Sequence, residues 1–188
     1  MFHFLISAKH PDTGAPAYTK EELWAEASML ILGGADTTAV TLSGIFFYLV
    51  RDEQRLGKLV KEIRSTFSSA EDIVPGPELQ SCVYLKAVIE ETMRLAPAGT
   101  SEMSREVLAG GTTINGEHYP AGVIIGAASW AQSRNYVYGD PYIFRPERWI
   151  VDEENGVTAA SIALLRLTTT LSPKYRVRVR GRTWRGWR

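Results

Sequence analysis

A group of small, acidic and hydroxyl-bearing residues interrupts an apolar stretch in the sequence GGADTT, from Gly33 to Thr38. Two adjacent glycines inside a helix cost roughly 1 kcal/mol each relative to alanine, so the pair suggests close approach by a ligand or another backbone. The Thr37 hydroxyl can bond to the carbonyl four residues back, and Asp36 beside it can pass protons to a bound reactant. The alternative is a small-residue helix crossing in which Asp36 pairs with a basic neighbour.

A second candidate is the pair Glu91 and Arg94 in ETMR, since residues three apart on a helix lie on one face. Alone, this is a common surface ion pair. Arg148, in the segment FRPERW, could join them in a buried charged cluster. Such a cluster contributes little net stability after desolvation, so its value would be to fix the irregular segment against the helix.

Three helices are expected to carry these residues. The first is a long helix from about Lys20 to Val50, with Thr19 as its N-cap. Its apolar residues 27–50 also fit a transmembrane span, but a charge at Asp36 disfavours insertion and favours a buried central helix. A polar helix follows over about 52–67, and a third runs from near Pro77 until just before Pro97.

From Ser104 onward the pattern changes to short extended pieces punctuated by glycine. Asn115 and Gly116 predict a tight hairpin turn. A short helix is expected over residues 129–138, and the proline-rich, aromatic segment up to Trp149 is expected to be irregular. The predicted fold class is therefore mainly α with a small β region.

The order GGADTT, ETMR, a glycine-rich β region opening with SREV, and FRPERW resembles the cytochrome P450 family over roughly residues 4–160. The resemblance implies a fragment of that fold: central long helix, E-x-x-R helix, β hairpins and PERW meander. Some phrases are similar to filamentous-fungal members. It further implies a haem-iron monooxygenase, an oxidoreductase that inserts one oxygen atom from O2 into a small organic substrate and is supplied with electrons by a reductase.

The resemblance also implies roles for individual residues. Asp36 and Thr37 would be the acid and alcohol that support dioxygen protonation, although Gly33 replaces the usual alanine of that motif. Glu91, Arg94 and Arg148 would form the family's structural triad, and Arg105 would hold a haem propionate.

The main departure is the iron ligand, because the family's cysteine loop, F-x-x-G-x-R-x-C-x-G, does not follow Trp149. The single cysteine, Cys82, reads as a buried inert thiol, and His3, His10 and His118 offer no convincing substitute. No metal ligand is therefore assigned, and the chain alone is expected to be inactive.

The resemblance also implies a location. Family members reach the endoplasmic reticulum membrane through an N-terminal anchor, which is absent here, and the expectation is otherwise a cytoplasmic location.

The resemblance implies that residues 1–165 are a partial cytochrome P450 domain, and the charge pattern sets residues 166–188 apart as a basic tail. The tail holds Lys174 and seven arginines, whereas all 21 acidic residues lie at or before Glu154, which leaves residues 1–165 with a net charge of −8. Codon arithmetic indicates that the tail is out of frame and that the adjacent frame encodes the missing haem loop; a disordered tail is the other description.

The alternative function is that of a non-enzymatic helical protein whose arginine-rich end binds nucleic acid or anionic membrane. Without such a role for the tail, no nucleic-acid partner is expected.

Overall fold

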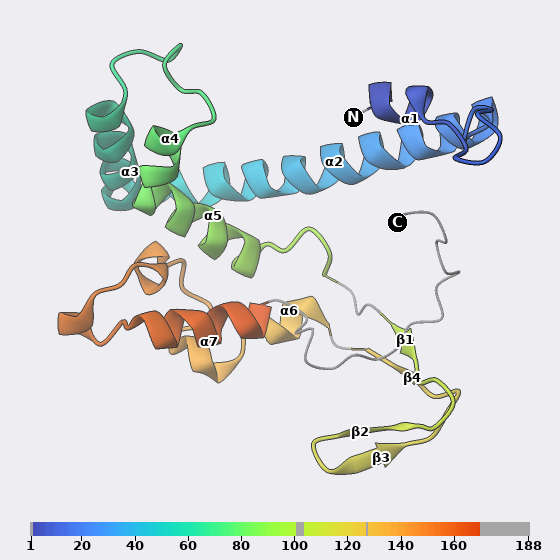
Figure 1. Cartoon of the computed structure of the whole chain (residues 1–188). Helices are drawn as coiled ribbons and strands as arrows, with labels where there is room; N and C mark the ends of the chain where they lie inside the picture. The colour runs from blue at the N-terminus through green and yellow to red at the C-terminus, as the bar shows by residue number, and fades with distance from the viewer. Residues whose placement is uncertain (1, 101–103, 127, 170–188) are drawn as a thin grey trace.

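The computed structural model describes residues 2–100, 104–126 and 128–169. Figure 1 shows a long helix, α2 (Lys20–Leu49), with the short helix α1 (Phe2–Ser7) folded back beside its first turns. Thr19 caps α2 as expected: its side chain accepts the Glu22 N–H, and the Glu22 carboxylate accepts the Thr19 N–H. Residues 170–188, which make up most of the basic tail, lie outside the described residues.

Two further helices follow α2. Helix α3 (Glu53–Thr66) corresponds to the polar helix expected from the sequence. The prediction of one continuous helix from Pro77 is wrong. The structure has two helices there, α4 (Pro77–Ser81) and α5 (Val83–Leu95), which are separated at Cys82. Cys82 has ψ 88°, which lies outside the helical range and interrupts the helical backbone hydrogen bonds there.

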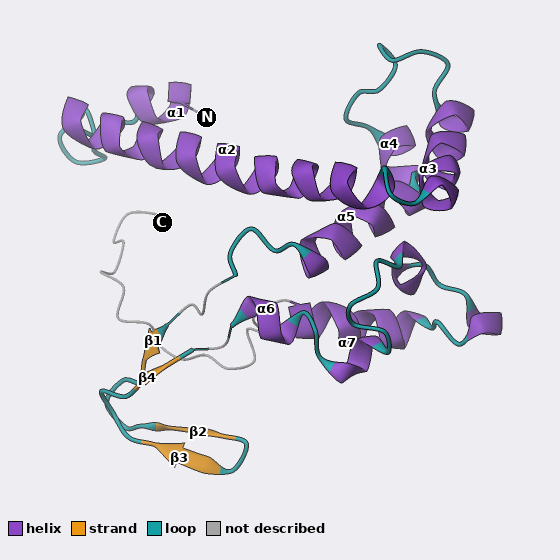
Figure 2. Cartoon of the chain, turned by 180° about the vertical axis from the view of Figure 1, so that it is seen from behind, coloured by secondary structure: helices purple, strands orange, loops and turns teal. Residues whose placement is uncertain are grey.

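The β region consists of two small antiparallel sheets. Strand β1 (Arg105–Glu106) pairs with β4 (Ile124–Ile125), and β2 (Thr112–Ile114) pairs with β3 (Glu117–Tyr119). The expected hairpin turn is present between β2 and β3, with Asn115 at φ 52° and Gly116 at φ 87° (Figure 2). Two positive φ angles in succession are the requirement of a type I′ turn, which explains the Asn-Gly pair.

Short helices form the last part of the described chain: α6 (Ser129–Gln132), the 3₁₀ helices η1 (Tyr136–Tyr138), η2 (Pro146–Trp149) and η3 (Glu153–Asn155), and then α7 (Ala159–Thr169). Helix α7 was not expected from the sequence, and it runs past the boundary drawn at residue 165. Mainly helical architecture with small antiparallel sheets confirms the predicted fold class.

Helix α5 lies between the two apolar clusters of the core. On one side Tyr84, Val88 and Leu95 pack with Leu49 of α2 and with Phe144. On the other side Ala87 packs with a cluster from the C-terminal part of the chain, formed by Tyr138, Trp149, Ile162 and Leu165. The core therefore surrounds the helix that carries Glu91 and Arg94.

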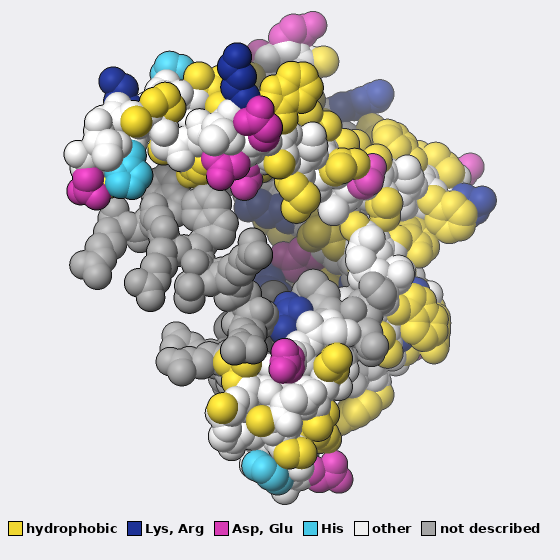
Figure 3. All heavy atoms as spheres, turned by 90° about the vertical axis from the view of Figure 1, so that its right-hand side faces the viewer, with side chains coloured by type: hydrophobic (Ala, Val, Ile, Leu, Met, Phe, Trp, Pro, Cys, Tyr) yellow, Lys and Arg dark blue, Asp and Glu magenta, His cyan; other side chains and the backbone are white. Residues whose placement is uncertain are grey.

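Most of α2 is not part of this core. Leu49 is its only buried residue, and residues 31–40 are all exposed, so the expectation of a buried central helix does not hold in this structure. Among the described residues, α2 is long and apolar enough to cross a membrane, a property that it shares with core helices and signal sequences. Figure 3, seen from the right-hand side of Figure 1, shows hydrophobic side chains exposed among charged ones over the upper part of the molecule.

The contact between α2 and α5 occurs near the C-terminal end of α2. A Cβ atom at Gly44 would lie 2.7 Å from Thr92 Cγ2 and 3.4 Å from Ala96 Cβ, so glycine permits this close approach. At Gly33 and Gly34 a Cβ would meet nothing within 4 Å. The small-residue helix crossing therefore occurs at Gly44 and not at the glycine pair.

Candidate functional site

Glu91 and Arg94 lie on the buried face of α5, and both side chains are 0% exposed. Arg94 donates from Nε to Glu91 Oε2 at 2.9 Å and from Nη2 to Glu91 Oε1 at 2.8 Å. This two-bond geometry is the strongest arrangement available to an arginine and a carboxylate. The pair is therefore internal, unlike the surface pair that ETMR alone would suggest.

Helix η2 brings two more donors to the same carboxylate. Arg148 Nε donates to Glu91 Oε1 at 3.0 Å, and the indole Nε1 of Trp149 donates to Glu91 Oε2 at 2.9 Å. The backbone N–H of Arg145 also donates to Glu91 Oε1, at 2.8 Å. The structure thus brings Glu91, Arg94 and Arg148 together and adds Trp149, whose hydrogen-bonding role sequence reasoning missed.

The remaining N–H groups of the two arginines bind the chain that connects α6 to η2. Arg94 Nη1 donates to the carbonyls of Ser133 and Pro141 at 2.7 and 2.6 Å, and Arg148 Nη2 donates to that of Asp140 at 3.0 Å. Further bonds reach the carbonyls of Tyr138 and Ile143. A segment with little regular structure is thereby held by side chains, which satisfies carbonyls that no helix or sheet would bind.

The electrostatic balance of the cluster favours an ionised Glu91. Burial by itself would raise the pKa of Glu91, but the hydrogen bonds and charges of Arg94 and Arg148 and the Arg145 N–H outweigh it. The pKa therefore lies below its ordinary value. One carboxylate faces two guanidinium groups, and the bound carbonyl dipoles compensate the surplus positive charge. The cluster is suited to fixing geometry rather than to exchanging protons.

Asp36 and Thr37 lie on the exposed middle of α2. The Thr37 hydroxyl donates to the Gly33 carbonyl at 2.7 Å, the bond that the spacing predicted, yet the helix continues unbroken through it. Among the described residues Asp36 forms no ion pair, so the alternative of a basic neighbour has no support here. No hydrogen bond or ion pair joins either residue to the Glu91 cluster within the described part of the chain.

Arg105 lies at the start of the β region, in β1, opposite Ile125 of β4. It is partly buried, and its Nη1 donates to the neighbouring Ser104 carbonyl at 3.0 Å. The expected role of Arg105, the binding of a haem propionate, stays a prediction.

Two carboxylates of the site were missed from the sequence. Glu62 of α3 accepts the backbone N–H groups of Tyr84 and Leu85 at the start of α5, each at 2.8 Å. Glu147 of η2 accepts from Lys58 of α3 at 2.6 Å. Burial alone would raise the pKa of Glu147, but the Lys58 hydrogen bond, a backbone hydrogen bond and the charges of Lys58 and Arg55 together outweigh it, so the pKa is lowered. Their partners lie 22 to 89 residues away, a range over which sequence spacing carries no signal.

Comparison with known proteins identifies the class to which this site belongs. The sequence profile of the cytochrome P450 family matches residues 1–163. The chain therefore belongs to the cytochrome P450 family, whose cofactor is haem.

Fungal relatives carry the same signal. The chain is 42% identical over 162 residues to the cytochrome P450 monooxygenase fscF of Fusarium equiseti, covering 85% of this chain and 30% of the relative. It is 41% identical over 167 residues to the monooxygenase apf8 of Gibberella fujikuroi, covering 88% and 45%. With poxM of Penicillium oxalicum the identity is 37% over 161 residues, covering 85% and 31%. The chain thus spans between about a third and a half of the length of these relatives.

The described residues do not complete a haem-thiolate site. Iron in this family is held by a cysteine thiolate, and the only cysteine, Cys82, is 1% exposed with its thiol directed at the Glu78 carbonyl at 3.6 Å. Histidines 3, 10 and 118 are exposed, and the described residues contain no group of three or more metal-binding side chains. The described residues therefore hold part of the family's scaffold, and within them Cys82 is buried and belongs to no group of metal-binding side chains.

Proposed function

We propose that residues 1–165 are part of a haem-dependent monooxygenase and that the 188-residue chain by itself has no monooxygenase activity. The observation that carries the proposal is the Glu91 network, in which α5 and η2 are joined through a carboxylate that accepts from Arg94, Arg148 and Trp149. The family match over residues 1–163 and the monooxygenase names of the relatives support the same reaction class.

Within that function the residues have separate tasks. Glu91, Arg94 and Arg148 hold the segment between α6 and η2 in place. Asp36 and Thr37 are the proton-delivering acid and alcohol, and Arg105 binds a haem propionate. The oxidised molecule is a small organic substrate, and a reductase supplies the electrons. These roles are drawn from the family and are supported by the positions of the residues in matching motifs.

The inactivity of the chain follows from its tail, which we propose is translated out of frame. The last base of each codon, read with the first two bases of the next, permits Asn-Leu-Ala-Trp-Leu-Glu across Arg182 to Arg188. The junction of Arg178 and Val179 permits TGT, a cysteine codon, and that of Arg180 and Gly181 permits GGG, a glycine codon. Upstream, the same frame permits Pro-Phe-Ser and then Pro-Arg, at the spacing of the family's cysteine loop.

One position disagrees with this frame. The junction of Lys174 and Tyr175 reads ATA or GTA, isoleucine or valine, where the loop has glycine, so a further base change is required there. The family profile stops at residue 163, inside α7, although Leu165 is buried and Arg166 binds Glu90. These contacts support in-frame sequence up to about Leu165, the boundary at which we propose that the frame changes.

Sequencing the genomic locus and the transcript tests the frame. The expected result is an uninterrupted shifted frame with a cysteine codon at the Arg178–Val179 junction. A stop codon before that junction, or another codon in its place, contradicts the proposal.

Absorption spectroscopy tests the function independently. The chain is mixed with haem, reduced and exposed to carbon monoxide, and no thiolate-type Soret band is expected. A frame-restored protein, made at the full length of the relatives and carrying this segment with its frame corrected, should give that band and oxidise a substrate, and a serine in place of its new cysteine should abolish both. If the 188-residue chain gives the band and the Cys82→Ser variant loses it, Cys82 is the ligand and the proposal is wrong.

A further inference from the structure

Helix α5 begins without a cap of its own. Its N-cap residue, Cys82, makes no side-chain capping bond, and the first turn of α5 holds no acidic residue. The first backbone N–H groups of any helix have no partner within the helix, and an uncapped start frays. The start of α5 therefore needs a partner from elsewhere in the chain.

Glu62 supplies that partner from α3. Its Oε1 accepts the Tyr84 N–H and its Oε2 accepts the Leu85 N–H, both at 2.8 Å in a partly buried setting. A carboxylate here satisfies two free donors and lies at the positive end of the helix dipole. Glu62 therefore caps two of the N–H groups at the start of α5, although it lies 22 positions upstream of Tyr84.

The same face of α3 also binds η2. Lys58 is four residues before Glu62, so both side chains project from one side of the helix. Lys58 Nζ donates to Glu147 Oε1 at 2.6 Å, and Arg55 Nε lies 3.7 Å from Glu147 Oε2. The Tyr84 hydroxyl donates to Glu147 Oε1 at 3.3 Å, which links the two contacts.

We propose that Glu62 and Glu147 are positioning residues that clamp α3 onto α5 and η2 and so set where Glu91 meets Arg148 and Trp149. Glu91 lies seven residues after Tyr84, two turns on the same face of α5 and about 10 Å along its axis. Because a helix is stiff over two turns, fixing its first turn also fixes the position of Glu91 along the helix axis and its rotation about that axis. The clamp makes α3, which has no buried residue, part of the scaffold of the site.

Amide exchange and the Trp149 indole signal, measured by NMR on the full 188-residue chain, test this proposal. In Glu62→Ala, we expect exchange at the Tyr84 and Leu85 amides to accelerate about tenfold and the indole N–H resonance of Trp149 to shift. Glu62→Gln should recover part of both effects, because an amide oxygen still accepts one bond. Lys58→Met should shift the indole resonance and leave the two amides protected.

Glu90→Gln is the matched control, because Glu90 also lies on α5 and loses a two-bond contact, to Arg166, without touching the clamp. It should change neither signal. If Glu62→Ala exposes the two amides but leaves the indole resonance in place, Glu62 is a local cap only and the positioning role is refuted. Should Glu62→Ala fail to fold, the same comparison between Glu62→Gln and Glu90→Gln decides the question.

Discussion

The indole N–H of Trp149 and the guanidinium Nε of Arg94 donate to the same oxygen of Glu91, each at 2.9 Å. The adjacent residue, Arg148, donates to the other oxygen at 3.0 Å. The last two residues of PERW, Arg148 and Trp149, thus both donate hydrogen bonds to one carboxylate. Because the three donors come from two elements, a change in Glu91 should separate α5 from η2.

Glu91→Gln should reduce the free energy of unfolding by roughly 3–5 kcal/mol, because it leaves two buried guanidinium groups without their counter-charge. Urea unfolding followed by tryptophan fluorescence measures the change. Glu90→Gln removes the contact with Arg166, whose side chain is 58% exposed, and should cost no more than about 1 kcal/mol. Similar losses for both variants would contradict the buried network.

Stability should depend on pH through Glu91. Its pKa is below the ordinary value of 4.5 in the folded chain, so its stabilisation is fully present above about pH 4.5 and is lost as the pH falls through the folded pKa. When unfolding is measured at pH values decreasing from 7, the urea concentration at the midpoint should therefore decrease once the pH is below about 4.5. Glu91→Gln should flatten the curve, with a residual slope from Glu147, whose pKa is also lowered. An unchanged slope would mean that Glu91 does not titrate as described.

Two glycines of α2 should respond oppositely to alanine. Gly34→Ala should raise the free energy of unfolding by up to about 1 kcal/mol, because nothing lies within 4 Å of the new Cβ and alanine favours a helix. Gly44→Ala should instead lower it, because a clash with buried Thr92 costs about 1–3 kcal/mol and exceeds the helix gain. Thermal unfolding of both variants is the measurement. A stabilised Gly44→Ala would show that α2 does not cross α5 at this point.

Thr37→Val and Asp36→Asn should each leave the free energy of unfolding within about 0.5 kcal/mol of the parent, since both side chains are exposed. In the frame-restored haem protein the same variants should lower substrate oxidation, which separates a chemical role from a structural one. Thr41→Val is a suitable control, because Thr41 makes an equivalent bond to the Thr37 carbonyl, at 3.0 Å. Equal losses of activity in all three variants would argue against a special role for the pair.

Local signals in the sequence predicted the local structure. The N-cap at Thr19, the polar helix α3 and the Asn115-Gly116 turn each depend on a few neighbouring residues, and each is present. The break at Cys82 could not be predicted, because no glycine or proline marks it. The Glu62 carboxylate that accepts the freed N–H groups comes from another helix.

The candidate site divides in the same way. Pairing of Glu91 with Arg94 follows from helical spacing, and motif order suggested Arg148, whereas the bond from Trp149 depends on the three-dimensional path of the chain. Burial of α2 was expected from its apolar composition. Composition alone does not specify the partner, and in this structure α2 meets the buried core only at the end near Gly44 and Leu49.

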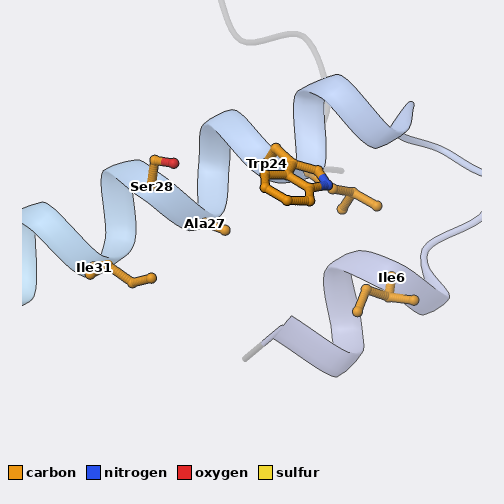
Figure 4. Close-up of a pocket in the computed structure, with 6 residues that line it drawn as sticks. Ile6, Trp24, Ala27, Ser28 and Ile31 are labelled. Carbon is orange, nitrogen blue, oxygen red and sulfur yellow. The ribbon is translucent and has the colours of Figure 1, made fainter.

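The exposed length of α2 has a consequence for the life of this chain in a cell. A 30-residue helix is about 45 Å long, and here it carries Trp24 and Met29 at 77% and 70% exposure. At its N-terminal end, Ile6, Trp24 and Ile31 line an open apolar pocket between α1 and α2, shown in Figure 4. Chaperones bind exposed apolar surfaces of this kind, and proteases degrade the chains that carry them. The abundance of the chain in a cell would therefore depend on chaperone binding and proteolysis as well as on its folding equilibrium.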